Sequence, residues 1–279
     1  LCRVHGSRNC HPVLISGNRN VATRCIDGNS CLMTTTYRIG QIVPSSNVTM
    51  ETEIPAVFRE REKHYDDRFT FHSSRMRMKQ VTKEELAAMD RDSDRCALEL
   101  SDAAVDVMGY ACLVAIMSMG LGYHRESQSR LHQVTIDNHH PCPVVSSAGA
   151  LVEGLTVLGA NKIALITPYR KPLTDLVCQY LESEGFEVID ALSLGIPDNL
   201  EVARQDPKAP IELVDRLTLA NVDTLVASAC VQMPSLPAVA CLQAKTGIPT
   251  LSASVATSYR MMQELGLQSR IPGYGALFE

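Results

Sequence analysis

Residues 222–230 read VDTLVASAC, an apolar run that ends in a cysteine. Residues 105–112 read VDVMGYAC, and both runs have the composition and length of buried β-strands. Two further pairs of similar blocks surround them in the same order: RIGQIVPSSN (38–47) with KIALITPYRK (162–171), and PVVSSAGAL (143–151) with PTLSASVAT (249–257). Chance readily repeats one block, but not three blocks in order. We infer that the chain consists of two pseudo-equivalent halves.

Strands and helices alternate along both halves. A capping box of Thr82 and Glu85 opens a predicted helix at 82–103, and Gly185 ends another at 173–185. The predicted strands are 37–44, 105–112, 161–168, 222–230 and 248–254. This alternation predicts an α/β fold in which each half is a mainly parallel sheet flanked by helices, with the active site in the cleft between the halves.

The repeat also predicts the limits of the halves. The first half is expected at 33–150; it carries Cys112, and its final segment crosses over to the other half. The second half is expected at 151–279; it carries Cys230, and its C-terminal segment can return to the first half.

Residues 1–32 differ from the rest of the chain. They contain four arginines and one aspartate and so carry +3, whereas 33–279 carries −8. The segment has no helical or strand period, and we interpret it as an N-terminal extension without ordered structure. A transit peptide or a metal site are the alternatives, although its four cysteines fit no zinc pattern.

The overall composition is that of an ordinary globular protein, with 45% hydrophobic and 20% charged residues in 279. The net charge of −5 and the absence of Trp argue against a nucleic-acid partner. No apolar run reaches the roughly 20 residues that a membrane helix needs, so no membrane association is expected. The sequence shows no secretion signal, and we therefore expect a reducing, cytoplasmic compartment.

The two cysteines of the repeat are the candidate catalytic groups. Cys112 and Cys230 each follow a predicted parallel strand, where ligands bind in open α/β sheets. A helix is expected after each cysteine, near Ser235 in the second half, and helix N-terminal N–H groups lower the pKa of a thiol. The alternative is that both cysteines are buried structural thiols, but their equivalent places in the repeat argue against that interpretation. Thiols facing one substrate from opposite sides suit chemistry at a carbon next to a carboxylate.

Several motifs around these cysteines resemble the maleate cis–trans isomerase family of the aspartate/glutamate racemase superfamily. The motifs are YRIGQIVPSSN, FTFHSSRMRMKQV, GYACLVAIMSMG, SAGALVEGL and SACVQMPSLPAV, and the resemblance covers about 33 to 279. Amino-acid racemases of the superfamily carry Cys-Asn-Thr and Gly-Cys-Thr, whereas this chain has Ala-Cys-Leu-Val and Ala-Cys-Val-Gln. Arylmalonate decarboxylases keep only one of the two cysteines, whereas this chain keeps both.

The resemblance implies a covalent isomerisation of maleate to fumarate. Cys112 would add to the alkene as a thiolate, and Cys230 would protonate the neighbouring carbon. The succinyl-cysteine would then rotate about its single bond and eliminate fumarate. The resemblance implies no cofactor and no metal, a homodimer, and a place in the degradation of nicotinate-type pyridines.

The family's substrate contacts map onto residues beside the cysteines. Besides Cys112 itself, they are Asn47, Tyr169 and Asn199 and the backbone N–H groups of Leu113, Val114, Val231 and Gln232. Local sequence alone leaves structural roles open for all three side chains. Asn47 could equally be a turn or capping residue, Tyr169 an ordinary half-buried ring, and Asn199 an ordinary loop residue.

Some other residues are weaker candidates. Arg75 and Arg77 alternate with methionines, a pattern that indicates an exposed strand face rather than a dicarboxylate site. We interpret His124 as a packing residue rather than a catalytic base. The segment 113–124 is either a lid or simply the helix after Cys112.

Two rivals remain on sequence grounds. One is a two-cysteine racemase of an acidic amino acid, which would need the Asn and Thr that this chain lacks. The other is a two-lobed dicarboxylate-binding protein without catalysis, which predicts unreactive thiols at neutral pH.

Overall fold

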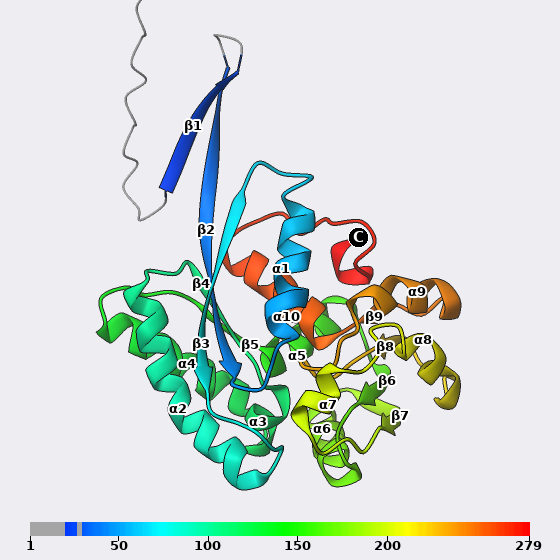
Figure 1. The fold of residues 1–279 in the computed structure, drawn as a ribbon. Helices are drawn as coiled ribbons and strands as arrows, with labels where there is room; N and C mark the ends of the chain where they lie inside the picture. The colour runs from blue at the N-terminus through cyan, green and yellow to red at the C-terminus, as the bar shows by residue number, and fades with distance from the viewer. Residues whose placement is uncertain (1–19, 27–29) are drawn as a thin grey trace, which may run out of the picture.

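The computed structural model describes residues 20–26 and 30–279, with side chains from residue 34 onward. The described part of the chain forms two sheets, each in its own half of the molecule (Figure 1). The first sheet contains β1 (Asn20–Ile26), β2 (Ser30–Pro44), β3 (Arg68–Met76), β4 (Val107–Tyr110) and β5 (Val144–Ser146). The second contains β6 (Lys162–Thr167), β7 (Glu187–Ser193), β8 (Thr224–Val226) and β9 (Thr250–Leu251).

All strand pairs are parallel except β1 with β2. In the first sheet β2 lies between β3 and β4, and β5 follows β4. In the second sheet the order is β7-β6-β8-β9, so that β6 occupies the place of β2. The predicted α/β fold of two mainly parallel sheets is therefore confirmed, and the two halves share one topology.

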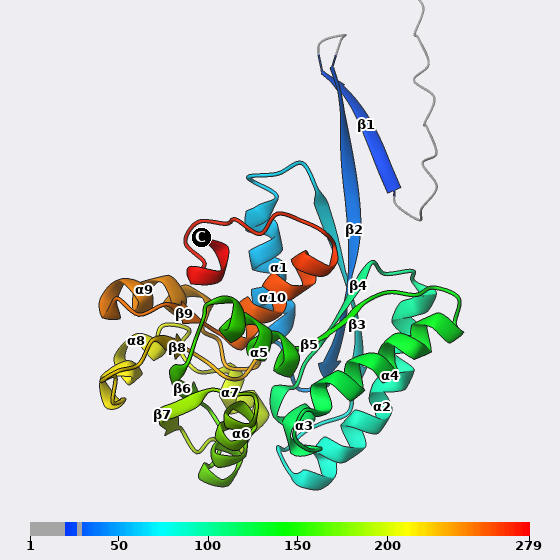
Figure 2. The same ribbon diagram turned by 180° about the vertical axis from the view of Figure 1, so that it is seen from behind.

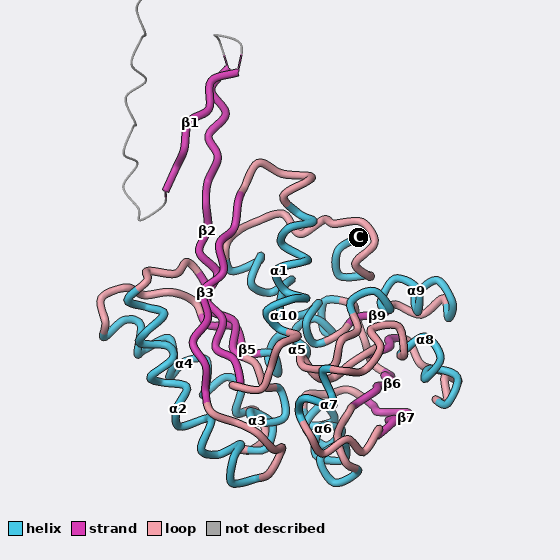
Figure 3. The backbone as a smooth tube through the Cα atoms, in the orientation of Figure 1, coloured by secondary structure: helices cyan, strands magenta, loops and turns pink. Residues whose placement is uncertain are grey.

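Helices pack around both sheets (Figure 3). The helices of the first half are α1 (Met50–Arg61), α2 (Lys83–Asp102), α3 (Leu113–Ser118), α4 (Tyr123–Asp137) and α5 (Ser147–Val157). Those after β6 are α6 (Lys171–Ser183), α7 (Asn199–Ala203), α8 (Pro210–Leu213), α9 (Leu236–Thr246) and α10 (Ala253–Glu264). None of the helices in the described residues is long and apolar enough to cross a membrane.

The ends of α2 and α6 follow the sequence signals. The Thr82 hydroxyl accepts a hydrogen bond from the Glu85 N–H, as the capping box predicts. The Glu85 carboxylate departs from that motif, because it accepts from the N–H groups of Lys79 and Gln80 instead. Gly185 follows α6 with φ +100°, a conformation that favours glycine.

Helix α10 belongs in space to the first half, although it lies near the end of the chain. It packs against α1, α5, β4 and β5 (Figure 2). Gly109 of β4 permits this close approach, because a Cβ atom there would lie 2.9 Å from the Met261 sulfur. The C-terminal segment thus returns to the first sheet and covers one of its faces.

The strands differ in length from the sequence prediction. β8 ends at Val226, although the N–H groups of Ala227 and Ala229 still bond the carbonyls of Leu251 and Ile166 in the neighbouring strands. The Ser228 hydroxyl bonds the Cys230 carbonyl. β2 begins at Ser30 rather than at Tyr37. A local apolar run shows where a strand passes through the core, but not where its ladder of hydrogen bonds stops.

Residues 20–26 and 30–32 also depart from the expected unstructured extension, because they belong to β1 and β2. β1 pairs with the outer part of β2, from Ser30 to Thr36, and the pair stands out from the body (Figure 1). The remaining residues of that extension, 1–19 and 27–29, lie outside the described residues.

Candidate active site

A narrow cavity of about 10 Å³ lies between the two halves. All nine residues singled out from the sequence line it, together with Pro44, Met78 and Val81. Its polar side chains are nearly inaccessible: Asn47 is 2%, Asn199 4% and Gln232 3% exposed. The cavity is therefore an enclosed, largely dehydrated site at the carboxyl ends of the parallel strands, the edge at which open α/β sheets bind ligands.

Cys112 is placed at this edge by β4 and α3. The Ala111 N–H still bonds the Ile42 carbonyl of β2, and Cys112 is the N-cap residue of α3. Its sulfur faces the N–H groups of Ala115 and Val114 but forms no capping hydrogen bond with them. Burial raises the pKa of the Cys112 thiol to about 12 and the neighbouring Cys230 adds to the rise, while the two N–H groups oppose it. In the empty site Cys112 is therefore a thiol at neutral pH.

Cys230 occupies the equivalent place after β8. The Tyr169 hydroxyl lies beside its sulfur and donates to the Ala229 carbonyl at 3.4 Å, and the N–H groups of Gln232 and Met233 also face the sulfur. Burial raises the pKa of Cys230; these three donors lower it, and the Glu53 carboxylate raises it further. The cradle of each sulfur thus uses N–H groups two and three residues after the cysteine.

The N–H groups that face the sulfurs belong to Val114, Ala115, Gln232 and Met233. The expected substrate contacts of the N–H groups of Leu113, Val114, Val231 and Gln232 stay a prediction, and all four residues line the cavity. Ala115 has a recognisable signal, because the side chain of an N-cap residue faces the N–H groups two and three residues later. Met78 and Val81, from the loop between β3 and α2, gave no such signal.

Asn47 follows the end of β2 and combines both of its expected roles. Its Oδ1 accepts the Met50 N–H at 3.0 Å, which caps the first turn of α1. Its backbone carbonyl accepts two bonds from the Arg75 guanidinium, which is also paired with Glu51 at 2.8 Å. The Asn47 amino group is left to face the cavity. Arg75 therefore holds a site residue in place and does not line the cavity itself.

Tyr169 and Asn199 bring the second half to the cavity. Tyr169 follows β6, is 4% exposed, and has its hydroxyl between the Cys230 sulfur and the Ala229 carbonyl. Asn199 is the first residue of α7, and its amino group donates to the Ser46 hydroxyl at 2.8 Å. Tyr169 presents a donor to the cavity, whereas Asn199 ties the two halves together.

The Gln232 side chain is fully used by hydrogen bonds to the first half and to Asn199 of its own half. Its amino group donates to the carbonyls of Ser46 and Asn199, each at 2.8 Å. Its oxygen accepts from the N–H groups of Val48 at 3.0 Å and Thr49 at 3.4 Å. Only the backbone of Gln232 is available to the cavity, as the resemblance implied.

The weaker candidates have structural partners. His124 is buried, and its Nδ1 lies 2.6 Å from the Tyr180 hydroxyl. In the segment 113–124, residues 113–117 are buried within α3. The described residues contain no group of His, Cys, Asp and Glu side chains that could hold a metal ion.

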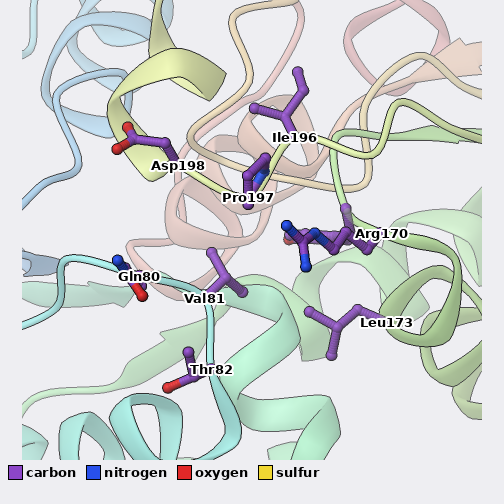
Figure 4. A pocket seen from close by; sticks show the side chains of 9 residues that line it. Gln80, Val81, Thr82, Arg170, Leu173, Ile196, Pro197 and Asp198 are labelled. Atoms are coloured by element: carbon purple, nitrogen blue, oxygen red, sulfur yellow. The ribbon is translucent and has the colours of Figure 1, made fainter.

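A second, wider cavity of about 330 Å³ shares Val81 and Tyr169 with the first. Figure 4 shows side chains that line this second cavity. Arg170 points into this outer cavity, and its guanidinium forms no hydrogen bond or ion pair with any described residue. A β-bridge between Gln80 and Asp198, which also line this cavity, joins the two halves.

The two mainly parallel sheets, each with a cysteine after one of its strands, define a class of α/β enzyme. Residues 39–278 match the model of the arylmalonate decarboxylase family, and the chain belongs to that family. Within that class it belongs to the maleate isomerases. It is 62% identical to the maleate isomerase of Pseudomonas putida over 88% of this chain and 98% of that protein.

Solved structures agree with this assignment. A maleate isomerase variant from Pseudomonas putida, with maleate, is 58% identical and superimposes with a TM-score of 0.86, covering 87% of this chain and 97% of that one. A maleate cis–trans isomerase variant from Nocardia farcinica, described with a covalently bound succinylcysteine intermediate, is 46% identical, with a TM-score of 0.84 and coverage of 87% and 98%.

Proposed function

We propose that this chain isomerises maleate to fumarate through a succinyl-cysteine intermediate on Cys112. The observation that carries the proposal is the meeting of Cys112 and Cys230 at one enclosed cavity, each sulfur facing two backbone N–H groups. The covalent succinylcysteine described for the Nocardia farcinica relative supports the same chemistry.

The reaction begins with the Cys112 thiolate. Its sulfur lone pair forms a C–S bond to one alkene carbon of maleate, and the alkene π electrons move to the neighbouring carbon. The Cys230 thiol transfers its proton to that carbon, which leaves succinyl-Cys112 and a Cys230 thiolate. The former double bond is now single and rotates. Cys230 then removes a proton from the same carbon, the C–S bond breaks, and fumarate and the Cys112 thiolate are released.

The groups around the two cysteines stabilise the species formed in these reaction steps. The N–H groups of Val114 and Ala115 stabilise the small thiolate fraction of Cys112, and a thiolate of high pKa is an intrinsically strong nucleophile. Asn47 and Tyr169 offer donors to the substrate carboxylates. Burial of the cavity keeps water from the carbanionic carbon, which would otherwise take a stray proton.

The resemblance supports the remaining parts of the proposal. We propose that the reaction needs no cofactor, because thiol addition and proton transfer balance without one. We also propose a homodimer that works in the cytoplasm during degradation of nicotinate-type pyridines.

The decisive experiment is a proton NMR time course with maleate alone. The maleate alkene signal should give way to that of fumarate without added cofactor. Cys112→Ser should abolish both turnover and the covalent adduct in mass spectra. Cys230→Ser should abolish turnover while an adduct on Cys112 can still form. Full turnover in either variant would contradict the mechanism, and racemisation of aspartate without maleate turnover would favour the racemase.

A further inference from the structure

Glu53 is a buried carboxylate that the isomerisation mechanism above does not use. It lies on α1 of the first half and is 6% exposed. One carboxylate oxygen accepts the N–H groups of Ser235 at 2.6 Å and Leu236 at 2.7 Å, and the other accepts from the Ser254 hydroxyl. All three partners are donors, which is the pattern expected for an ionised carboxylate, and they oppose the burial that raises the pKa of Glu53.

These contacts make Glu53 the cap of a helix in the other half. Ser235 is the N-cap residue of α9, but its own side chain forms no capping bond, and its hydroxyl is buried without a partner among the described residues. Glu53 binds the N–H groups that Ser235 would otherwise leave unpaired. A carboxylate here is also stabilised by the positive end of the helix dipole.

The capped turn is the one that carries Cys230. Thr49, one turn before Glu53 on α1, donates its hydroxyl to the Gln232 carbonyl at 2.7 Å. Thr49 and Glu53 therefore hold the two ends of the segment 232–236, whose first residues face the Cys230 sulfur. The position of the thiol is set from the opposite half of the molecule.

The pseudo-symmetry of the chain is broken at this position. The block at 162–171 follows the block at 38–47 by 124 residues, and the same offset places Val177 opposite Glu53. Val177 is a fully buried apolar residue of α6, and α6 packs against α3, the helix that follows Cys112. A carboxylate thus lies behind Cys230, and a valine occupies the equivalent place behind Cys112.

We propose that Glu53 is a positioning residue for Cys230: it holds the Cys230 segment from the opposite half and favours the protonated thiol there, the form that a proton donor needs. The groups that act on Cys230 are the Tyr169 hydroxyl, the N–H groups of Gln232 and Met233, and Glu53. Burial is the largest cause that raises the pKa of Cys230; among these groups Tyr169 and the N–H groups lower that pKa, and Glu53 raises it. The assignment of Cys230 as proton donor rests on the proposed isomerase function.

The test measures the Cys230 thiol itself, in a Cys112→Ala background that removes the other site thiol. The rate of Cys230 alkylation by iodoacetamide, followed by mass spectrometry from pH 6 to 10, reports its pKa. Glu53→Gln keeps the size of the side chain but removes the charge. We expect alkylation at pH 8 to rise about tenfold, which corresponds to a pKa lower by about one unit. Glu60→Gln, on the outer side of α1 beside Lys63, is the control and should leave the rate unchanged.

Glu53→Asp separates charge from packing. The shorter side chain keeps the charge, so the high pKa of Cys230 should persist even if the capping contacts weaken. An unchanged pKa in folded Glu53→Gln, or a pKa that falls in Glu53→Asp, would overturn the proposal, and the Asp variant alone decides it if the Gln variant does not fold. Because alkylation needs no maleate, failure of wild-type isomerisation in the NMR assay would be a separate result.

Discussion

Thr49 and Gln232 are joined by two hydrogen bonds across the boundary between the halves. The Thr49 hydroxyl donates to the Gln232 carbonyl at 2.7 Å, and the Thr49 N–H donates to the Gln232 side-chain oxygen at 3.4 Å. Gln232 thereby caps the start of α1, while Glu53 of α1 caps α9. The capping is reciprocal, so contacts between the halves help to fix the walls of the cavity.

The reactivity of Cys112 should rise with pH over an unusually wide range. Because burial raises the pKa of its thiol to about 12, the thiolate fraction increases roughly tenfold for each pH unit up to that value. Alkylation of Cys112 in a Cys230→Ser background should therefore still be rising at pH 9 to 10, where a free cysteine peptide has levelled off. A plateau near pH 7 would show that other groups stabilise the thiolate.

Removal of the Asn47 amino group should weaken substrate anchoring. A lost hydrogen bond to a charged group costs about 1.5–3 kcal/mol, so kcat/KM for maleate should fall roughly 10- to 100-fold in Asn47→Ala. That variant also loses the cap of α1, which should cost about 1 kcal/mol of stability. Asn47→Ser keeps a capping oxygen and should retain stability but not kcat/KM. Unchanged kcat/KM in the Ser variant would make Asn47 purely structural.

Arg170 should speed the capture of a dianionic substrate. Its unpaired guanidinium faces the outer cavity that adjoins the site. Arg170→Gln should lower kcat/KM several-fold at low ionic strength and leave kcat unchanged, and the difference should shrink near 0.15 M salt, where the Debye length is about 8 Å. Lys171→Gln is the matched control, because Lys171 is paired with Asp175. A salt-independent loss of kcat would assign Arg170 a different role.

A chain that starts at Met33 should fold and react like the full chain. The truncation removes β1 and the outer end of β2, whereas the pairing of β2 with β3 begins at Thr36 and with β4 at Ile39. We expect the same Tm and the same kcat for maleate. A chain that starts at Gly40 is the contrasting variant, because it loses the 2.7 Å bond from the Arg38 N–H to Asp106 and should unfold more easily. A large drop in Tm for the Met33 chain would place β1 within the stable fold.

The sequence predicted the sheet edges well because apolar runs and their repeats are local signals. Cys112, Cys230 and Tyr169 all follow such runs, and the structure places them at one cavity. The limits of β8 and the loop carrying Met78 and Val81 were not predictable in this way, because hydrogen bonding to neighbouring strands and packing across the cavity decide them.

Contacts between the halves left the least trace in the sequence. The cap of α9 is Glu53, which precedes Leu236 by 183 residues. No local motif around Ser235 could therefore predict it. Conversely, β1 was missed because its residues carry no clean alternation of apolar and polar side chains.

The return of α10 to the first sheet has a consequence for synthesis of the protein. Proteins are made from the N-terminus, and an early domain ordinarily folds before the later one is complete. Here the face of β4 at Gly109 has to wait for Met261 of α10, which is translated after nearly all of the second half. The apolar first sheet therefore stays partly uncovered on the ribosome until the end of translation, and premature termination before α10 would yield an aggregation-prone fragment rather than a folded lobe.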